Sequence, residues 1–461
     1  MEDASRHQVE AQCPGLLVAS VLAIVLTALP LQHVLLAQTV NSFWCHVARS
    51  LSSIPALLWQ DHQTSCVDIL RALPSLKCWF THLPLGSIKL QLDSQLGTID
   101  DLNVLGVHDA GHLLHALSLC LPDGANEAAL SSVLKLCPKI RHLEISDYDL
   151  VGGTETTGIF LRYLPCCLKS LRLRLFPFID DPVFETCVST ASQLQILELE
   201  GLDTITDAGI MSLCKLKELR SLKLLFTRLG DRPQISEGAL TAMLFDIGSS
   251  SAGHGLEDFE ISYNAGPPLV LLDGGNRFVQ EVLGKHCRLK RLALSGVVGL
   301  GNAAFVGLTH ACPSLACLSL FRPGSALTSA GLLEGLTALT GLAELSLAGV
   351  GDFMGTIQAA TLCPLRRLEM SRYLRSSVQT DMRSTLRLLK ACPSLDTVVL
   401  RAVFSAEQVE SFMDRPDMLN LLKCSKLDEQ TYITKLSRDG PTGKSCLSVH
   451  LEHCIPEQFF M

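Results

Sequence analysis

The chain has 461 residues, of which 48% are hydrophobic and only 18% are charged, and its formal net charge is −8. This composition indicates either membrane segments or an unusually leucine-rich soluble fold. The negative balance argues against a general nucleic-acid binder, which needs a basic footprint, so we expect no nucleic-acid partner.

The first predicted element is an apolar run at residues 16–31. It falls short of the ~20 residues with which a helix crosses a bilayer. The residues before it carry Glu2, Asp3 and Glu10 against Arg6, whereas a secretory signal peptide begins with a positively charged region. We therefore expect no membrane association, and a membrane-anchored or secreted receptor stays as an alternative.

The same stretch belongs to a longer pattern over residues 14–60. Paired apolar residues at helical spacing lead to a Leu-Pro step, and a second apolar pair, a valine and a tryptophan follow in turn. This order resembles an F-box, with Leu17 and Val18 in place of the usual leading Leu-Pro and with Ala19 and Ser20 at the usual acidic positions. A three-helix unit of this size leaves an apolar surface for a partner to cover.

An F-box implies docking to a Skp-type adaptor, which links to a cullin scaffold. The resemblance assigns this contact to nine residues, while residues 1–13 ahead of them are expected to be disordered. The nine are Val21, Leu22, Val25, Leu29, Pro30, Leu31, Val34, Val40 and Trp44.

The pattern LxxLxL then recurs, with starts 23 to 37 residues apart. This is the period of a leucine-rich repeat. Each match predicts a short strand whose last two leucines point inward while its other side chains face outward. The starts are Ile140, Leu168, Leu194, Leu219, Leu256, Leu289, Leu315, Leu342, Leu365 and Leu395.

The predicted fold class is therefore an α/β solenoid, a leucine-rich-repeat horseshoe with parallel strands on its concave side and helices on its convex side. The solenoid is expected to span residues 111–425. Residues 61–110 are interpreted as a linker and degenerate first repeats, and residues 426–461 as a C-terminal cap. Within residues 83–120, which are ambiguous, 85–90 and 113–119 are the candidates for degenerate first repeats.

Helices are predicted between the strands, for example at residues 205–216, capped by Thr206 or Asp207, and at residues 329–339. Stacking would give their apolar faces a shared core. The expected inward residues are Ile210, Leu213 and Cys214 in the first and Leu332, Leu333 and Leu336 in the second.

Cysteines stand where helices end and strands begin. The chain holds 18 cysteines, which is below the density of a disulfide scaffold, and no pair has CxxC spacing. We predict reduced thiols, a cytoplasmic or nuclear location, and packed, unreactive side chains at six positions. These are Cys137, Cys167, Cys287, Cys312, Cys363 and Cys392.

With "ITDAG" after a strand and a cysteine before the next one, residues 110–405 resemble the cysteine-containing leucine-rich repeats of eukaryotic F-box proteins. The outward residue of each central LxL alternates in charge across the earlier repeats. This ladder indicates either mutual neutralisation or a polar half-groove for a charged peptide. Its members are Glu144, Arg172, Glu198, Lys223 and Glu260.

In the later repeats the same positions predict a floor of small, partly apolar residues. The floor comprises Ala293, Ser319, Ser346, Glu369 and Val399, with Cys317 and Ala348 nearby. Small residues leave room for an incoming side chain, so this floor and the insertion at residues 264–276 are the favoured substrate surface. The candidate substrate-binding residues are Arg172, Lys223, Glu260, Arg291, Phe321 and Arg367.

Catalytic patterns are absent from the sequence. Residues 438–446 end like a phosphate-binding loop but lack its first glycine and precede a predicted strand, which indicates a surface turn. His108, His112 and His115 would share one helix face, but no glutamate completes HExxH. We expect no enzymatic activity, no metal and no cofactor.

The F-box resemblance directly ahead of these repeats predicts the substrate-recognition subunit of a Skp-cullin-F-box-type ubiquitin ligase. Its partners would be a Skp-type adaptor, a cullin scaffold and an unknown protein substrate on the concave surface. The alternatives are a leucine-rich-repeat interaction scaffold without a ligase role and the receptor named above.

Overall fold

The computed structural model describes residues 88–92 and, with gaps, residues 114–452. The gaps are 122–126, 148–156, 177–178, 202–203, 227–234, 250–254, 264–267, 280–282, 350–352, 362, 372–384, 386–387, 390–391, 393, 402–421, 427–430 and 441–442. The predicted F-box and all nine predicted adaptor contacts, from Val21 to Trp44, lie outside the described residues. The chain divides into two compact units between Thr204 and Ile205.

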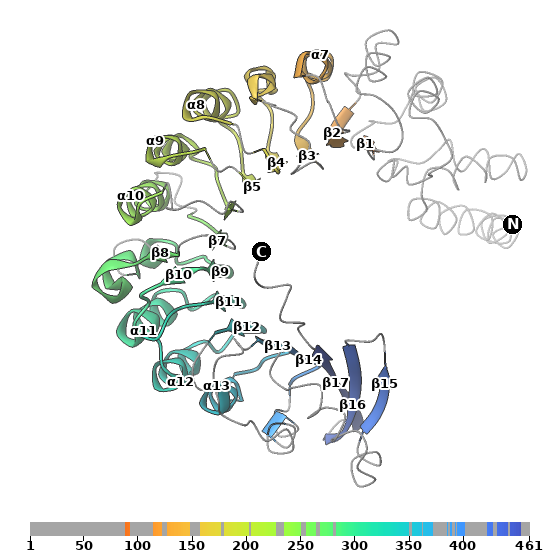
Figure 1. The fold of residues 1–461 in the computed structure, drawn as a ribbon, viewed down its shortest axis with the longest axis vertical. Coiled ribbons are helices and arrows are strands. Elements are labelled where there is room, and N and C mark those ends of the chain that lie inside the picture. The colour runs from red at the N-terminus through yellow and green to blue at the C-terminus, as the bar shows by residue number, and fades with distance from the viewer. Residues whose placement is uncertain are drawn as a thin grey trace, which may run out of the picture. The chain divides into compact units, whose positions relative to one another are not determined.

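The first unit contains a parallel sheet in the order β1-β2-β3-β4-β5. Its strands are β1 (Ile88–Leu92), β2 (Leu114–Leu121), β3 (His142–Asp147), β4 (Ser170–Arg174) and β5 (Ile196–Glu200). Between them lie α7 (Glu127–Leu136), the 3-10 helix η4 (Ile159–Tyr163) and α8 (Asp181–Thr190). Figure 1 shows α7 and α8 on one side of this sheet. β1 and β2 overlap the candidate first repeats at residues 85–90 and 113–119.

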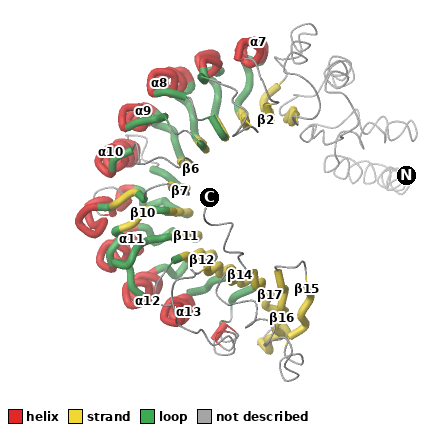
Figure 2. Tube along the Cα trace, viewed as in Figure 1, coloured by secondary structure: helices red, strands yellow, loops and turns green. Residues whose placement is uncertain are grey.

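The second unit continues the same strand–helix alternation. The strands are β6 (Ser221–Phe226), β7 (Asp258–Tyr263), β9 (Arg291–Ser295), β11 (Cys317–Phe321), β12 (Glu344–Ala348), β13 (Arg367–Ser371) and β14 (Thr397–Arg401). They pair in this order, all in parallel. The main helices are α9 (Asp207–Ser212), α10 (Glu237–Gly248), α11 (Asn302–Ala311), α12 (Ser329–Ala338) and α13 (Phe353–Ala360). Figure 2 shows them on one face of this unit's sheet.

In the described residues, three strands follow β14, which ends at Arg401. They are β15 (Leu422–Lys426), β16 (Thr431–Gly440) and β17 (Gly443–Glu452). β17 pairs in parallel with β14, and β16 pairs in antiparallel fashion with both β17 and β15.

The inward leucines produce the core of each unit. Neighbouring strands pair equivalent residues, so that Leu318 on β11 lies between Leu292 on β9 and Leu345 on β12. All three side chains are buried, and the residues between the two inward positions remain partly exposed. The alternation of period two is the geometry expected of a strand with one buried face. The predicted strand pattern is confirmed.

The two example helices agree with the prediction except at Leu333 and at Cys214, which is only half-buried. Thr206 caps α9, because its hydroxyl accepts a hydrogen bond from the Ala208 amide at 3.3 Å. In α12, Leu332 and Leu336 are buried, but Leu333 is 38% exposed, so the prediction for Leu333 is wrong. Successive residues of a helix are rotated by about 100° around its axis, so Leu333 points away from the face on which Leu332 and Leu336 are buried.

Neighbouring repeats are joined by a recurrent hydrogen bond on the helix side. The first residue of four helices accepts a backbone N–H from the start of the next repeat's return segment. The four pairs are Glu127 with Gly158, Asp207 with Ser236, Glu237 with Leu272 and Asn302 with Thr328. We call these contacts the repeat clamps.

The cysteine prediction holds at four of the six positions. Cys137, Cys312, Cys363 and Cys392 are buried, and burial raises the pKa of Cys137 to about 12 and those of Cys312 and Cys363 to about 11. Such thiols stay protonated at neutral pH and are poor nucleophiles. Cys167 is only half-buried.

Cys287 is exposed, so its predicted packing role is wrong. The preceding residue, His286, occupies the buried position and is 1% exposed. The Leu256 amide donates to His286 Nδ1 at 2.9 Å, and Nε2–H donates to the Leu244 carbonyl at 3.1 Å. This pairing requires the neutral ring, and burial lowers the pKa of His286.

The difference between the two cysteine environments can be measured by alkylation. We expect iodoacetamide to modify Cys287 at least ~10 times faster than Cys312 in the native chain, because access and thiolate formation are both restricted at Cys312. Peptide mass spectrometry over a time course reports each site, and exposed Cys166 serves as the fast reference. Equal rates at Cys287 and Cys312 would contradict the burial described above.

Candidate functional site

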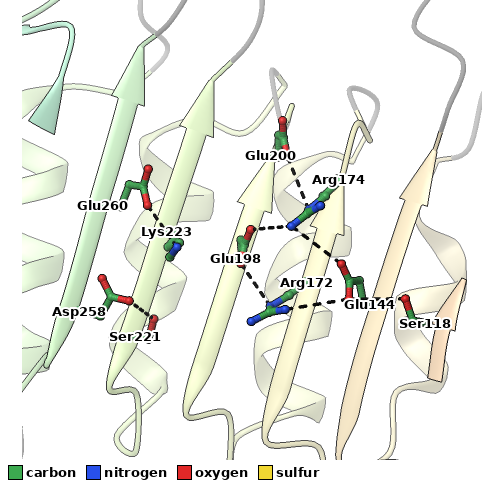
Figure 3. Close-up of polar contacts among 10 residues, drawn as sticks. All are labelled: Ser118, Glu144, Arg172, Arg174, Glu198, Glu200, Ser221, Lys223, Asp258 and Glu260. Carbon is green, nitrogen blue, oxygen red and sulfur yellow. Dashed lines mark hydrogen bonds and ion pairs between the residues drawn. The ribbon is translucent and has the colours of Figure 1, made fainter. Parts of the chain in front are cut away.

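The candidate site is the strand face, by which we mean the face of each unit's sheet opposite its helices. In Figure 3 the labelled side chains stand on this face, in front of the strands. The outward residues of successive strands lie side by side because the parallel register pairs equivalent positions. Each unit has its own set of polar contacts there.

In the first unit the ladder residues form a closed network of charges. Arg172 on β4 lies between Glu144 on β3 and Glu198 on β5, at 4.0 Å from the former carboxylate and 3.2 Å from the latter. Two residues further along β4, Arg174 lies 3.2 Å from Glu198, 3.9 Å from Glu144 and 3.7 Å from Glu200. Two arginines therefore share three glutamates (Figure 3).

In the second unit the ladder forms separate pairs. Lys223 on β6 lies 3.3 Å from Glu260 on β7. Two residues earlier, the Ser221 hydroxyl donates to Asp258 at 3.3 Å, and Asp258 is also 4.0 Å from Arg291 on β9. Both units thus satisfy the alternating charges internally, which supports the neutralising interpretation. Exposed pairs of this kind hold register and each contribute ~0.2–1 kcal/mol.

The predicted floor is present on four strands, up to Glu369 on β13, which lies in register with Ser346 and is partly exposed. Ala293, Ser319 and Ser346 lie in register on β9, β11 and β12 and are partly exposed. Val399, predicted to face outward, is 5% exposed, and Ala348 is also buried, so neither contributes to the surface. Val399 pairs in register with the longer Glu369 on one side and with a residue of β17 on the other, and a short side chain between two neighbouring strands is easily covered.

The two predicted arginines and the aromatic residue border this floor. Arg291 begins β9 and Arg367 begins β13, where Arg367 lies 3.4 Å from Glu369. Phe321 ends β11 and is partly exposed, with the Arg322 guanidinium 5.6 Å from its ring centre. The structure therefore places five of the six predicted substrate contacts in ion pairs, namely Arg172, Lys223, Glu260, Arg291 and Arg367.

The described part of the insertion at residues 264–276, which is residues 268–276, lies outside the main sheet. It forms β8 (Leu269–Val270), which pairs in parallel with β10 (Val297–Val298), followed by the 3-10 helix η6 (Leu272–Gly275). β10 directly follows β9 in the chain, so β8, which pairs with β10, lies beside the loop that leaves the end of β9. Val270 and Leu272 are exposed there.

The remaining sequence candidates do not form a chemical site in the described residues. Lys444 and Ser445 lie in β17, paired with β16, so a strand and not a helix begins at this point, as predicted. His115 lies in strand β2, so the helical spacing considered for the three histidines does not reach it. Among the described residues, no cluster of His, Cys, Asp and Glu is suited to a metal ion, and none of the helices has the length and apolarity of a membrane span.

Sequence reasoning missed Arg174, Glu200 and Asp258, which complete the polar contacts on the strand face. The signal was available, because side chains two residues apart on a strand share a face. His286 was missed because it is not part of any catalytic or metal pattern.

Comparison with known proteins bears on the fold. No family model and no curated protein matches the chain. A chain from the crystal structure of the Rad7 and Elc1 complex in yeast is 17% identical, with a TM-score of 0.51, over 87% of this chain and 90% of that chain. The leucine-rich repeat-containing protein LegL7 from Legionella pneumophila is 14% identical, with a TM-score of 0.33, over 69% and 94% of the two chains. The likeness to the yeast chain and the leucine spacing of the described repeats together show that this chain has a leucine-rich-repeat fold.

Proposed function

We propose that the chain is the substrate-recognition subunit of a Skp-cullin-F-box-type ubiquitin ligase. In this proposal residues 14–60 bind the Skp-type adaptor, and the strand face binds a target protein that other subunits modify. The chain itself contributes proximity and orientation and no side-chain chemistry.

The observation that carries the proposal is the row of parallel strands that presents outward side chains from separate repeats. Such a surface suits protein contacts because each repeat can vary its outward residues without disturbing the buried leucines. The yeast chain of similar fold was crystallised in complex with a second protein, Elc1, which supports a protein partner here. The F-box resemblance of residues 14–60 supports the Skp-type adaptor as that partner.

The strand face has its best opening for a target over Ala293, Ser319 and Ser346. These small residues leave space between the pair formed by Lys223 and Glu260 and the pair formed by Arg367 and Glu369. We therefore assign target contacts to Arg291 and Phe321 at the border of the floor and to the paired charges at Arg172, Lys223, Glu260 and Arg367. A target would exchange these exposed ion pairs at low cost.

The adaptor half of the proposal is tested by affinity capture of the full tagged chain from eukaryotic lysate. We expect Skp-type adaptor and cullin to be recovered in stoichiometric amounts. A Leu29→Ala, Trp44→Ala double variant should lose at least ~90% of both, because buried aromatic and aliphatic anchors carry most of the binding energy of such contacts.

The matched control is Leu333→Ala, which removes an exposed leucine from α12 and should leave adaptor capture unchanged. A well-folded chain that captures no adaptor contradicts the ligase role. That result would favour the second candidate, a leucine-rich-repeat scaffold, which the repeat structure supports equally well. A product confined to the membrane pellet would favour the receptor.

A further inference from the structure

The first unit has a basic edge where its helices end and its strands begin. Residues 128–143, 157–171 and 191–197 lead into β3, β4 and β5 and contain no aspartate or glutamate. We use the name basic edge for the Lys, Arg and His residues of these segments. They are Lys135, Lys139, Arg141, His142, Arg162 and Lys169.

The backbone sets two of these cations side by side. The Lys169 amide donates to the Arg141 carbonyl at 2.8 Å, which fixes the two residues at the same level of adjacent strands. Adjacent strands are ~4.8 Å apart, so the two side chains start within reach of one extended ligand. Arg141 is exposed and Lys169 is partly exposed.

The positive charge of this edge is not neutralised. Within the part of the chain that the structure describes, neither Arg141 nor Lys169 forms an ion pair. The neighbouring His142 reports the resulting potential. Its pKa is lowered, first by partial burial and then by the positive charges of Arg141, Lys169 and Arg172.

The equivalent edge of the second unit is neutralised, which makes the contrast informative. There Glu257, just before β7, lies 2.7 Å from Lys290 and 3.9 Å from Arg220. Asp258 lies 4.0 Å from Arg291 in the same way. In the first unit, the segments that lead into β3, β4 and β5 contain no acidic residue that could neutralise the basic edge in this way.

We propose that the basic edge binds an acidic segment of a partner protein, with Arg141 and Lys169 as its main contacts. The guanidinium suits a carboxylate because it can donate two parallel hydrogen bonds, and the ammonium adds a second positive charge one strand away. The chain as a whole carries −8, so the attraction is local and favours a short acidic segment over a nucleic acid. The proposal goes beyond the ligase function, because a scaffold without that role would use the same edge.

The test measures binding of a fluorescein-labelled peptide of repeating Glu-Asp-Gly to the full chain by fluorescence anisotropy at low and physiological salt. The Arg141→Gln, Lys169→Gln double variant is compared with a control, Arg220→Gln, Lys290→Gln, that changes the net charge equally at the neutralised edge. We expect salt-dependent binding that weakens about tenfold or more in the first variant and changes less than about twofold in the control. Circular dichroism verifies that both variants fold.

A second readout is local to the edge. Bound peptide places negative charge beside His142, which favours the imidazolium, so the pKa of His142 should rise on binding. The ring signal is followed by NMR over a pH series and is assigned with His142→Gln. Equal losses in both double variants, an unchanged His142 titration, or tighter binding of a single-stranded oligonucleotide of equal charge would each overturn the proposal.

Discussion

Replacing Gly296 with alanine is expected to destabilise the second unit by about 2–5 kcal/mol. Gly296 has φ +66°, a left-handed conformation that costs other residues ~1–2 kcal/mol. A Cβ there would lie 2.5 Å from the Tyr263 carbonyl oxygen and 2.9 Å from its Cβ. Overpacking of this kind adds ~1–3 kcal/mol.

The surroundings of Gly296 give it no room to move away. Its amide donates to the Phe321 carbonyl at 2.9 Å, and its own carbonyl accepts from the Leu269 amide at 2.9 Å. The residue is therefore held by three neighbouring segments at once. A shift that relieved the contact with Tyr263 would break at least one of these hydrogen bonds.

Thermal melting by circular dichroism and hydrogen exchange of peptides from β7, β9 and β11 measure the effect. The control is Gly341→Ala, since a Cβ at Gly341 meets nothing within 4 Å. It should change stability by no more than ~0.5 kcal/mol. If the two variants melt together and exchange alike, the close approach of Gly296 to Tyr263 is absent in solution.

The second large effect is expected at His286. His286→Cys introduces the residue that other repeats use, but it leaves the Leu256 amide and the Leu244 carbonyl without their partners in the core. Each orphaned group costs ~1–3 kcal/mol, so we expect a loss of about 2–5 kcal/mol at pH 7.5. Glycines at 248 and 255 would lie beside the smaller side chain without filling the space.

The loss should depend on pH in a defined direction. Because the pKa of His286 is lower in the folded chain than its ordinary value of 6.5, the neutral ring's stabilisation is complete above pH 6.5 and declines as pH falls below it. The gap between wild type and variant should therefore narrow with acidification. Denaturant unfolding at pH 7.5, 6.5 and 5.5 measures it, with His310→Gln as the control. A gap that is constant over this range would contradict the neutral, doubly bonded ring.

The strands could be predicted from sequence because their signal is repeated and stereochemically strict. A leucine at Leu318 must face the same way as Leu292 and Leu345, since parallel register leaves no alternative once one face is buried. The alternating charge of the ladder was readable for the same reason. The distances from Arg172 to Glu144 and to Glu198 could not be predicted from the sequence, because they depend on side-chain rotamers.

The errors arose at positions where one residue of offset matters. Cys312 stands three residues before the first leucine of its motif, and so does His286, whereas Cys287 stands two residues before Leu289. Counting back from the leucine does not decide burial by itself, because Cys363 also stands two residues before its leucine, Leu365, and is buried. Leu333 was wrongly predicted to be buried because the buried face of a helix is defined by the spacing of several apolar residues and not by the apolar character of one residue.

The repeat clamps bear on how such a chain can change over evolutionary time. Each clamp joins the first residue of one helix to a residue at the start of the next return segment, so it fixes only the last part of the loop that connects a strand to its helix. The clamped partners are accordingly separated by 26 to 35 residues in different repeats. Insertions and deletions in the loop of a single repeat can therefore accumulate during evolution while the repeat clamps between neighbouring repeats are retained.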